Sequence, residues 1–161
     1  MKIFISWSGD AGRQLAYRLN EWLPSIVPKA EPFLSSEIPG GAEWFRSLTD
    51  SLKGAEFGFV CLTPEAQKSP WLLFEAGALW RQTEGTRVVP IVAGLATSKI
   101  VGPLAHLQAK RFERRDVRSV CEQIAHATGL EPKRFQLNFE GIWPNLERDV
   151  RNDLVRYGIK V

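Results

Sequence analysis

The sequence predicts an α/β fold in which helices cover both faces of a mainly parallel sheet of five strands. Short apolar segments alternate with segments of helical periodicity from the first residues onward, and that alternation is typical of parallel sheets joined by crossover helices. Several apolar segments are continuous rather than alternating, as expected for strands buried on both faces. With 161 residues, of which 44% are hydrophobic and 24% charged, the chain is long enough for one ordinary globular domain.

Five segments are expected to form the strands. Residues 3–5, 57–62 and 88–92 are predicted to be central strands because they are almost entirely apolar. The segment 32–34 begins with proline, which cannot donate to a ladder of hydrogen bonds, so this strand is expected nearer an edge. Residues 109–112 are expected to form one more strand.

Helices are expected between these strands. Asp10 is predicted to cap the first helix and Pro24 to mark its end. Residues from about 42 to 53 carry apolar side chains at helical spacing and predict a second helix. Asp116 is predicted to cap a helix that follows the last strand.

The C-terminal segment is expected to add a further helix. The polar stretch 131–136 is expected to lead to it, and the apolar residues of the helix recur at three- and four-residue steps: Trp143, Leu146, Val150, Leu154 and Tyr157. We therefore divide the chain into a domain at 1–130 and, at 131–161, a linker and helix. That helix either packs on the domain or leads to a partner or sensor domain. Taken together, these elements predict a flavodoxin-like three-layer sandwich with an extra C-terminal helix.

Composition argues against several classes of protein. No apolar stretch reaches membrane-spanning length, and the N-terminus lacks the apolar core of a signal peptide, so a cytoplasmic location is expected. Cys61 and Cys121 lie in apolar segments and are expected to be buried free thiols. His106 and His126 are isolated, so no metal site is expected. The basic cluster at 110–118 lacks interleaved aromatic residues, which favours a solvated face or a partner contact over a nucleic-acid site.

The most informative motif runs from Trp71 to Glu75. Glu75 is a lone carboxylate in an otherwise apolar run, where the loss of hydration is costly. Ser69 and Pro70 form the pattern of an N-cap followed by proline at the first helical position. Trp71 and Glu75 are four residues apart and therefore share one face of the expected helix. Glu75 is the candidate catalytic residue, and the alternative is a structural carboxylate bonded to a neighbouring loop.

The expected sheet brings this motif to a crevice. In such sheets ligands bind beyond the carboxyl ends of the strands, where the strand order reverses. Trp7 and Ser8, the loop at 35–41, Trp71 and Glu75 are therefore expected to surround one site. Trp7 is expected at the start of a loop and as a substrate contact. Ser35 and Ser36 are interpreted first as turn formers and second as substrate contacts. No phosphate-loop or dinucleotide fingerprint accompanies them.

Together these residues resemble TIR (Toll/interleukin-1 receptor) domains, and more narrowly those of bacterial antiphage effectors. The residues that carry the resemblance are Ile3 to Trp7, Phe33 to Glu37 with Pro39, Gly40 and Gly41, Phe57 to Pro64, and Trp71 to Glu75. The resemblance covers about residues 1–129. It implies that Glu75 is essential for cleaving NAD+ between nicotinamide and ribose, so NAD+ is a substrate and no cofactor is expected. Trp7 departs from the pattern, because many relatives carry tyrosine there, and no basic residue follows it directly.

A single carboxylate suits that reaction. Most glycoside hydrolysis needs a second carboxyl group to protonate the leaving oxygen, whereas nicotinamide leaves NAD+ as a neutral molecule. Glu75 would stabilise the positive charge that develops on the ribose. Trp71 and Trp7 would form aromatic walls for the nicotinamide. Asp10 is the only other acid expected at this edge, and it is assigned to a cap. Whether an NAD+ nucleosidase of this kind releases linear or cyclic ADP-ribose is left open.

The resemblance also implies self-assembly. The loop of one copy, with Glu37, Ile38, Pro39, Gly40 and Gly41, would close the site of the next copy, and such head-to-tail contacts give open strands or filaments. The expected partners are further copies of the chain and a sensor domain or partner protein, with neither nucleic acid nor membrane contacted directly. Two alternatives remain: a non-catalytic TIR scaffold that recruits partners through this loop, and an enzyme like the nucleoside deoxyribosyltransferases.

Overall fold

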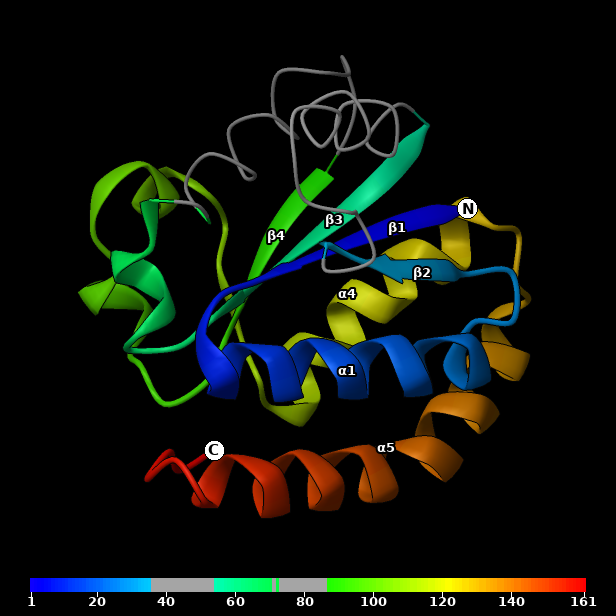
Figure 1. Ribbon diagram of the computed structural model, residues 1–161. Helices are drawn as coiled ribbons and strands as arrows, with labels where there is room; N and C mark the ends of the chain where they lie inside the picture. The colour runs from blue at the N-terminus through cyan, green and yellow to red at the C-terminus, as the bar shows by residue number, and fades with distance from the viewer. Residues whose placement is uncertain (36–53, 71, 73–86) are drawn as a thin grey trace.

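The computed structural model describes residues 1–35, 54–70, 72 and 87–161 (Figure 1). Within them lies a five-stranded sheet whose strands are all parallel. The strands, in chain order, are β1 (Lys2–Trp7), β2 (Glu31–Leu34), β3 (Ala55–Leu62), β4 (Arg87–Val92) and β5 (Lys110–Arg111). Each of the five forms at the predicted place.

The strand order is β2-β1-β3-β4-β5, which is the flavodoxin-like order. The predicted fold class is therefore confirmed, and β2 is the edge strand that its proline predicted. The order reverses between β1 and β3, so the crevice expected of this fold lies at the carboxyl ends of these two strands. Register places Trp7 beside Cys61 at that end.

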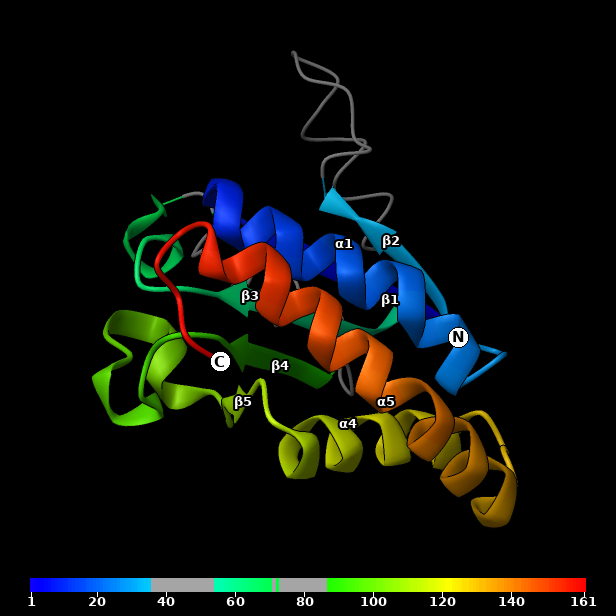
Figure 2. The same cartoon turned by 90° about the horizontal axis from the view of Figure 1, so that it is seen from below.

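Three helices lie on one side of the sheet (Figures 1 and 2). They are α1 (Gly9–Ile26), α4 (Arg114–Ala127) and α5 (Pro132–Val155). With the inward side chains of the strands, they enclose one continuous hydrophobic cluster, here called the main core. The helix predicted at 42–53 lies outside the described residues.

A second, smaller core forms on the opposite face of the sheet. Val60, Leu62 and Val92 contribute to it from the strands. Three short 3-10 helices lie in the described connections after β3 and β4: η2 (Ala66–Lys68), η3 (Thr97–Lys99) and η4 (Gly102–His106). Leu72 also belongs to this cluster and is fully buried.

The helix α5 packs on the domain through one buried apolar face. Its buried apolar residues are Phe135, Phe139, Trp143, Leu146, Val150 and Leu154. The Trp143 ring stacks on Phe139, with centroids 5.7 Å apart, and lies 5.5 Å from the ring of Phe112, which follows β5. The predicted linker at 131–136 is wrong, because helix α5 already begins at Pro132. Glu131 caps it, accepting hydrogen bonds from the main-chain nitrogens of Lys133 and Arg134.

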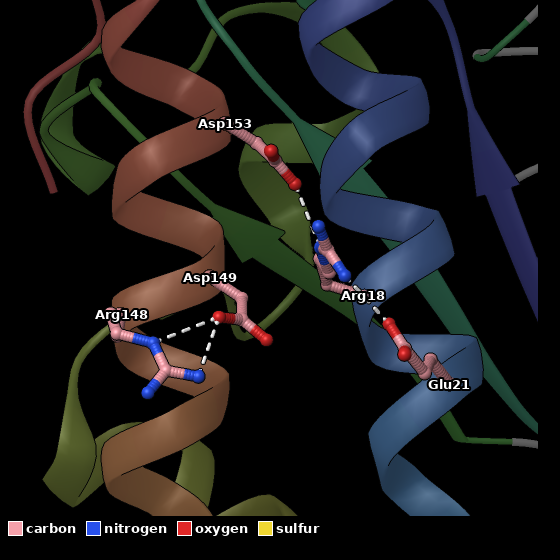
Figure 3. A network of polar contacts seen from close by, with 5 residues as sticks. All are labelled: Arg18, Glu21, Arg148, Asp149 and Asp153. Atoms are coloured by element: carbon pink, nitrogen blue, oxygen red, sulfur yellow. Dashed lines mark hydrogen bonds and ion pairs between the residues drawn. The ribbon is translucent and has the colours of Figure 1, made fainter.

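A polar joint connects α5 to α1 (Figure 3). The Arg18 guanidinium on α1 donates from Nε to Oδ2 of Asp153 on α5 over 2.7 Å, and from Nη1 to Glu21 over 2.8 Å. Asp153 is only 8% exposed. Its hydrogen bond raises the pKa of Arg18, so the buried carboxylate always faces a cation. The nearby pair of Arg148 and Asp149 lies entirely on α5.

Both predicted ends of α1 are wrong. Ser8 is the N-cap of α1, and Asp10 lies inside the first turn, where it pairs with Arg13 at 3.6 Å. Pro24 does not end this helix, which continues to Ile26. Proline has a φ that fits a helix and lacks its own N–H donor, so the residues after Pro24 can continue the helix at a cost in stability.

The cap of α4 also differs from the prediction. Its N-cap is Glu113. The Asp116 carboxylate lies in the first turn and accepts a hydrogen bond from the main-chain nitrogen of Arg111 over 2.9 Å. Asp116 therefore fastens the end of β5 to the start of α4, and its charge still suits the positive end of the helix.

The expectations for the thiols are confirmed. Cys61 and Cys121 are free and buried, and burial raises the pKa of both thiols, that of Cys121 to about 12. Both thiols therefore stay protonated and unreactive at neutral pH.

The basic cluster at 110–118 is largely engaged within the chain. Arg111 pairs with Glu113 at 3.1 Å and Arg114 with Glu140 on α5, while Arg118 lies over the ring of Phe135. Among the described residues no group of three or more metal-ligating side chains occurs. The helices in the described part of the chain include none that is long and apolar enough to cross a membrane.

Candidate functional site

Three of the predicted site residues lie within the described structure, all at the carboxyl edge of the sheet. Trp7 ends β1, Ser8 caps α1, and Ser35 directly follows β2. The predicted residues Ser36, Trp71 and Glu75, and the assembly residues at 37–41, lie outside the described residues. For those residues, the site stays a prediction.

Trp7 is part of the strand rather than of a loop, so that expectation was wrong. Its side chain is partly buried and packs against the main core. A methyl group placed on Gly12 of α1 would lie 3.9 Å from the Trp7 Cβ atom, which shows how closely helix and strand approach here. The indole nitrogen is buried and has no hydrogen-bond partner among the described residues. A buried donor without a partner is rare in native structures.

We expect Trp7→Ala to lower the free energy of unfolding by about 2 kcal/mol, less than a fully buried aromatic residue would. The cause is the packing of the indole on the main core. Chemical denaturation monitored by circular dichroism gives the value, and Trp7→Phe is the control that keeps most of the packing. Unchanged stability of Trp7→Ala would show that the indole does not support the core.

The helix predicted to carry Glu75 begins where the sequence indicates. Pro70 and Leu72 are helical, and the hydroxyl of Ser69 accepts a hydrogen bond from the main-chain nitrogen of Leu72 over 3.4 Å. Ser69 thus acts as the N-cap. The buried Thr63 holds the preceding turn, because its hydroxyl accepts from the nitrogen of Ala66 over 3.2 Å. The end of β3 is therefore fixed to the start of this helix.

The structure adds one acid that the sequence analysis missed. Glu65 follows β3 and its carboxylate lies against Gly9 at the start of α1. A methyl group on Gly9 would be only 2.9 Å from Oε2 of Glu65, and Gly9 has a φ of +71°. A carboxylate there suits the positive end of α1. The signal was present: Glu65 lies three residues after a predicted strand, on the same edge as Asp10.

A cavity of about 970 Å³ opens at the same edge, toward β4 and β5. Its walls come from the connections after β3 and β4, from the end of β5, and from residues 157–161, which follow α5. Figure 2 shows this last segment returning from α5 toward the end of β4. Trp7, Ser8 and Ser35 do not line the cavity, although Glu65 does. The cavity is therefore not formed by Trp7, Ser8 or Ser35, which are the predicted site residues within the described structure.

Comparison with known proteins identifies the sequence family. The family model described as the TIR domain matches residues 3–125. That range contains the sheet apart from Lys2, together with α1 and most of α4, and it leaves α5 outside. No curated protein matches the sequence.

Solved structures give a more distant similarity. An azoreductase from Bacillus anthracis str. Sterne has 8% sequence identity and a TM-score of 0.40, and the match covers 87% of this chain and 99% of that chain. The azoreductase AzrA has 10% identity and a TM-score of 0.39, with 86% and 99% covered. The fold assignment rests on the strand order and not on these two proteins.

Proposed function

The chain belongs to the TIR domain family, and from this premise we propose that it is an NAD+ nucleosidase that cleaves the bond between nicotinamide and ribose. The proposal is supported by the place of the Trp71 to Glu75 motif in the sequence. The sequence places it directly after a helix start that Ser69 caps, beyond the carboxyl end of β3. That is the edge at which α/β sheets bind their ligands.

The proposed chemistry needs little from the protein besides one charge. Glu75 is proposed to hold the ribose and to stabilise the positive charge that develops on it as nicotinamide departs. Water then adds to the ribose to give ADP-ribose, or an internal nucleophile adds to give a cyclic product. Trp7 ends β1 at the same edge of the sheet, and this position supports a role for the residue in holding the substrate.

The direct test is to incubate the concentrated protein with NAD+ and to measure released nicotinamide by liquid chromatography. Deoxynucleosides, offered in a parallel reaction, test for a nucleoside deoxyribosyltransferase-like activity. Release of nicotinamide supports the proposal. Base exchange among deoxynucleosides without NAD+ cleavage favours that alternative, and no reaction with either substrate favours a TIR scaffold.

We also propose that activity depends on self-assembly, in keeping with the general self-association of TIR domains. We expect specific activity to rise with protein concentration and Ile38→Asp to suppress it, because a charge at an apolar subunit contact opposes association. A dilution series with sedimentation measurements checks this. Leu137→Asp is the matched control, since Leu137 is 63% exposed on α5. Constant specific activity in dilute monomeric protein, unaffected by Ile38→Asp, would refute the assembly requirement.

The resemblance to antiphage effectors extends the proposal to immune defence. Depletion of NAD+ in an infected bacterial cell would be the consequence of assembly in this proposal. Protection of a host culture from phage by the wild type, and not by Glu75→Gln, tests that role.

A further inference from the structure

A cavity is formed at the carboxyl ends of β3, β4 and β5. We propose that the cavity of about 970 Å³ at this edge binds a small molecule that carries a phosphate group. This inference does not depend on NAD+ cleavage, because the walls of the cavity come from residues outside the Trp71 to Glu75 motif. The volume lies within the range of ordinary ligand pockets, and the carboxyl edge is where parallel sheets bind ligands.

Three basic side chains from three different elements line this cavity. Arg111 comes from the end of β5, Arg151 from α5, and Lys160 from the segment at 157–161. Among the described residues, the acidic side chains in its lining are Glu65 and Glu113, and Val161, whose main-chain oxygen accepts from Arg151, also lines it. The convergence of three basic side chains from separate elements favours an anionic ligand. Arginine binds phosphate through two parallel hydrogen bonds, and a phosphate offers three acceptor oxygens to be shared among several donors.

Both arginines are held by pairs that a ligand can replace. Arg111 contacts Glu113 at 3.1 Å, and Arg151 contacts Glu147 at 2.9 Å. The two arginine side chains are 61% and 55% exposed, so these pairs contribute little to stability. A phosphate can therefore recruit the Arg111 guanidinium, or the Nε and Nη2 atoms of Arg151 that contact Glu147, while Nη1 of Arg151 keeps its bond to Val161.

The segment at 157–161 is held in place as the outer wall. The nitrogen of Gly158 donates to the oxygen of Val155 over 3.0 Å, and that of Ile159 to Leu154 over 3.2 Å. With Gly158 at a φ of +69°, this is the Schellman arrangement that reverses a chain after a helix. Arg151 also donates to the main-chain oxygen of Val161.

Ile159 then seats the segment against the sheet. A methyl group on Gly94, which follows β4, would lie 2.5 Å from Cγ2 of Ile159, so glycine is needed for this contact. Ile159 also packs on the main core. The wall is thus preformed, and ordering it costs a ligand little binding free energy.

The test is calorimetric titration of the full chain carrying Glu75→Gln, which is not expected to turn over substrate, with AMP, inorganic phosphate and adenosine. We expect saturable binding of AMP and none of adenosine. Binding of inorganic phosphate as tightly as AMP would assign the site to the phosphate alone. Arg151→Gln should weaken AMP binding about tenfold or more, through loss of a charge-assisted hydrogen bond. Arg148→Gln is the matched control, because Arg148 lies on the same helix and outside the cavity lining.

Lys160→Gln provides a variant that leaves the contacts of Arg151 intact, and it should also weaken AMP binding. Equal weakening by Arg148→Gln, tight binding of adenosine, or no saturable binding of AMP and phosphate would overturn the proposal. Because heat of binding is measured without turnover, these outcomes are distinct from failure of the enzyme to cleave NAD+.

Discussion

NAD+ cleavage by Glu75→Gln is expected to fall about a hundredfold or more, while the domain stays folded. Glutamine keeps the size and the hydrogen-bonding oxygen of glutamate but removes its charge. If Glu75 acts by stabilising positive charge on the ribose, that loss removes most of the rate enhancement. Glu75→Ala is expected to be equally inactive, because the size and the hydrogen-bonding oxygen that glutamine retains contribute little without the charge.

Nicotinamide release under saturating NAD+ measures this effect, with circular dichroism and a melting curve to confirm the fold. Glu65→Gln is the matched control, because it removes a carboxylate that the structure places at the carboxyl edge of the sheet. Turnover near the wild-type rate in a folded Glu75→Gln protein would rule out the catalytic role.

Trp143→Ala should produce the largest loss of stability, lowering the free energy of unfolding by about 3–5 kcal/mol. Trp143 is 3% exposed and contacts rings on α5 and after β5, so its removal opens a cavity between the helix and the domain. Urea unfolding followed by circular dichroism measures the change. Leu137→Ala on the exposed side of α5 is the control, with an expected change within about 0.5 kcal/mol. A loss below about 1 kcal/mol for Trp143→Ala would mean that α5 does not contribute to the stability of the domain.

The strands were predictable because their signal is local. The apolar run at 57–62 has no polar residue to place at a surface, so burial on both faces follows from the sequence alone. The helix caps were less predictable, since Ser8 and Asp10 are both good cap residues at neighbouring positions. The helix begins after Ser8, although the Ser8 side chain makes no capping hydrogen bond. The start of α5 was indicated by Glu131 and Pro132, an acidic cap residue followed by proline at the first helical position. The polar residues of 131–136 nevertheless led to the prediction of a linker.

Of the candidate site, the sequence predicted the edge of the sheet at which three residues lie. The rule for parallel sheets puts Trp7, Ser8 and Ser35 at one edge, and the structure agrees for these residues. The approach of Glu65 to Gly9 depends on the turn that Thr63 holds, which no pattern in the sequence specifies. The cavity depends on the return of the chain after α5 to Gly94, a contact between residues far apart in sequence.

The docking of α5 on α1 also governs when the domain can complete its folding during synthesis. Arg18 and Asp153 are separated by 135 positions in the chain, so their pairing must wait until almost all of the described chain has emerged. At about 5–20 residues per second, α1 is made on the order of ten seconds before α5. Leu19, Leu23 and Ile26 lack their final cover during that interval. A ribosome-bound chain that ends before Trp143 therefore exposes apolar side chains that are covered in the folded domain. Chaperones recognise such exposed apolar surface, and unfinished chains aggregate through it.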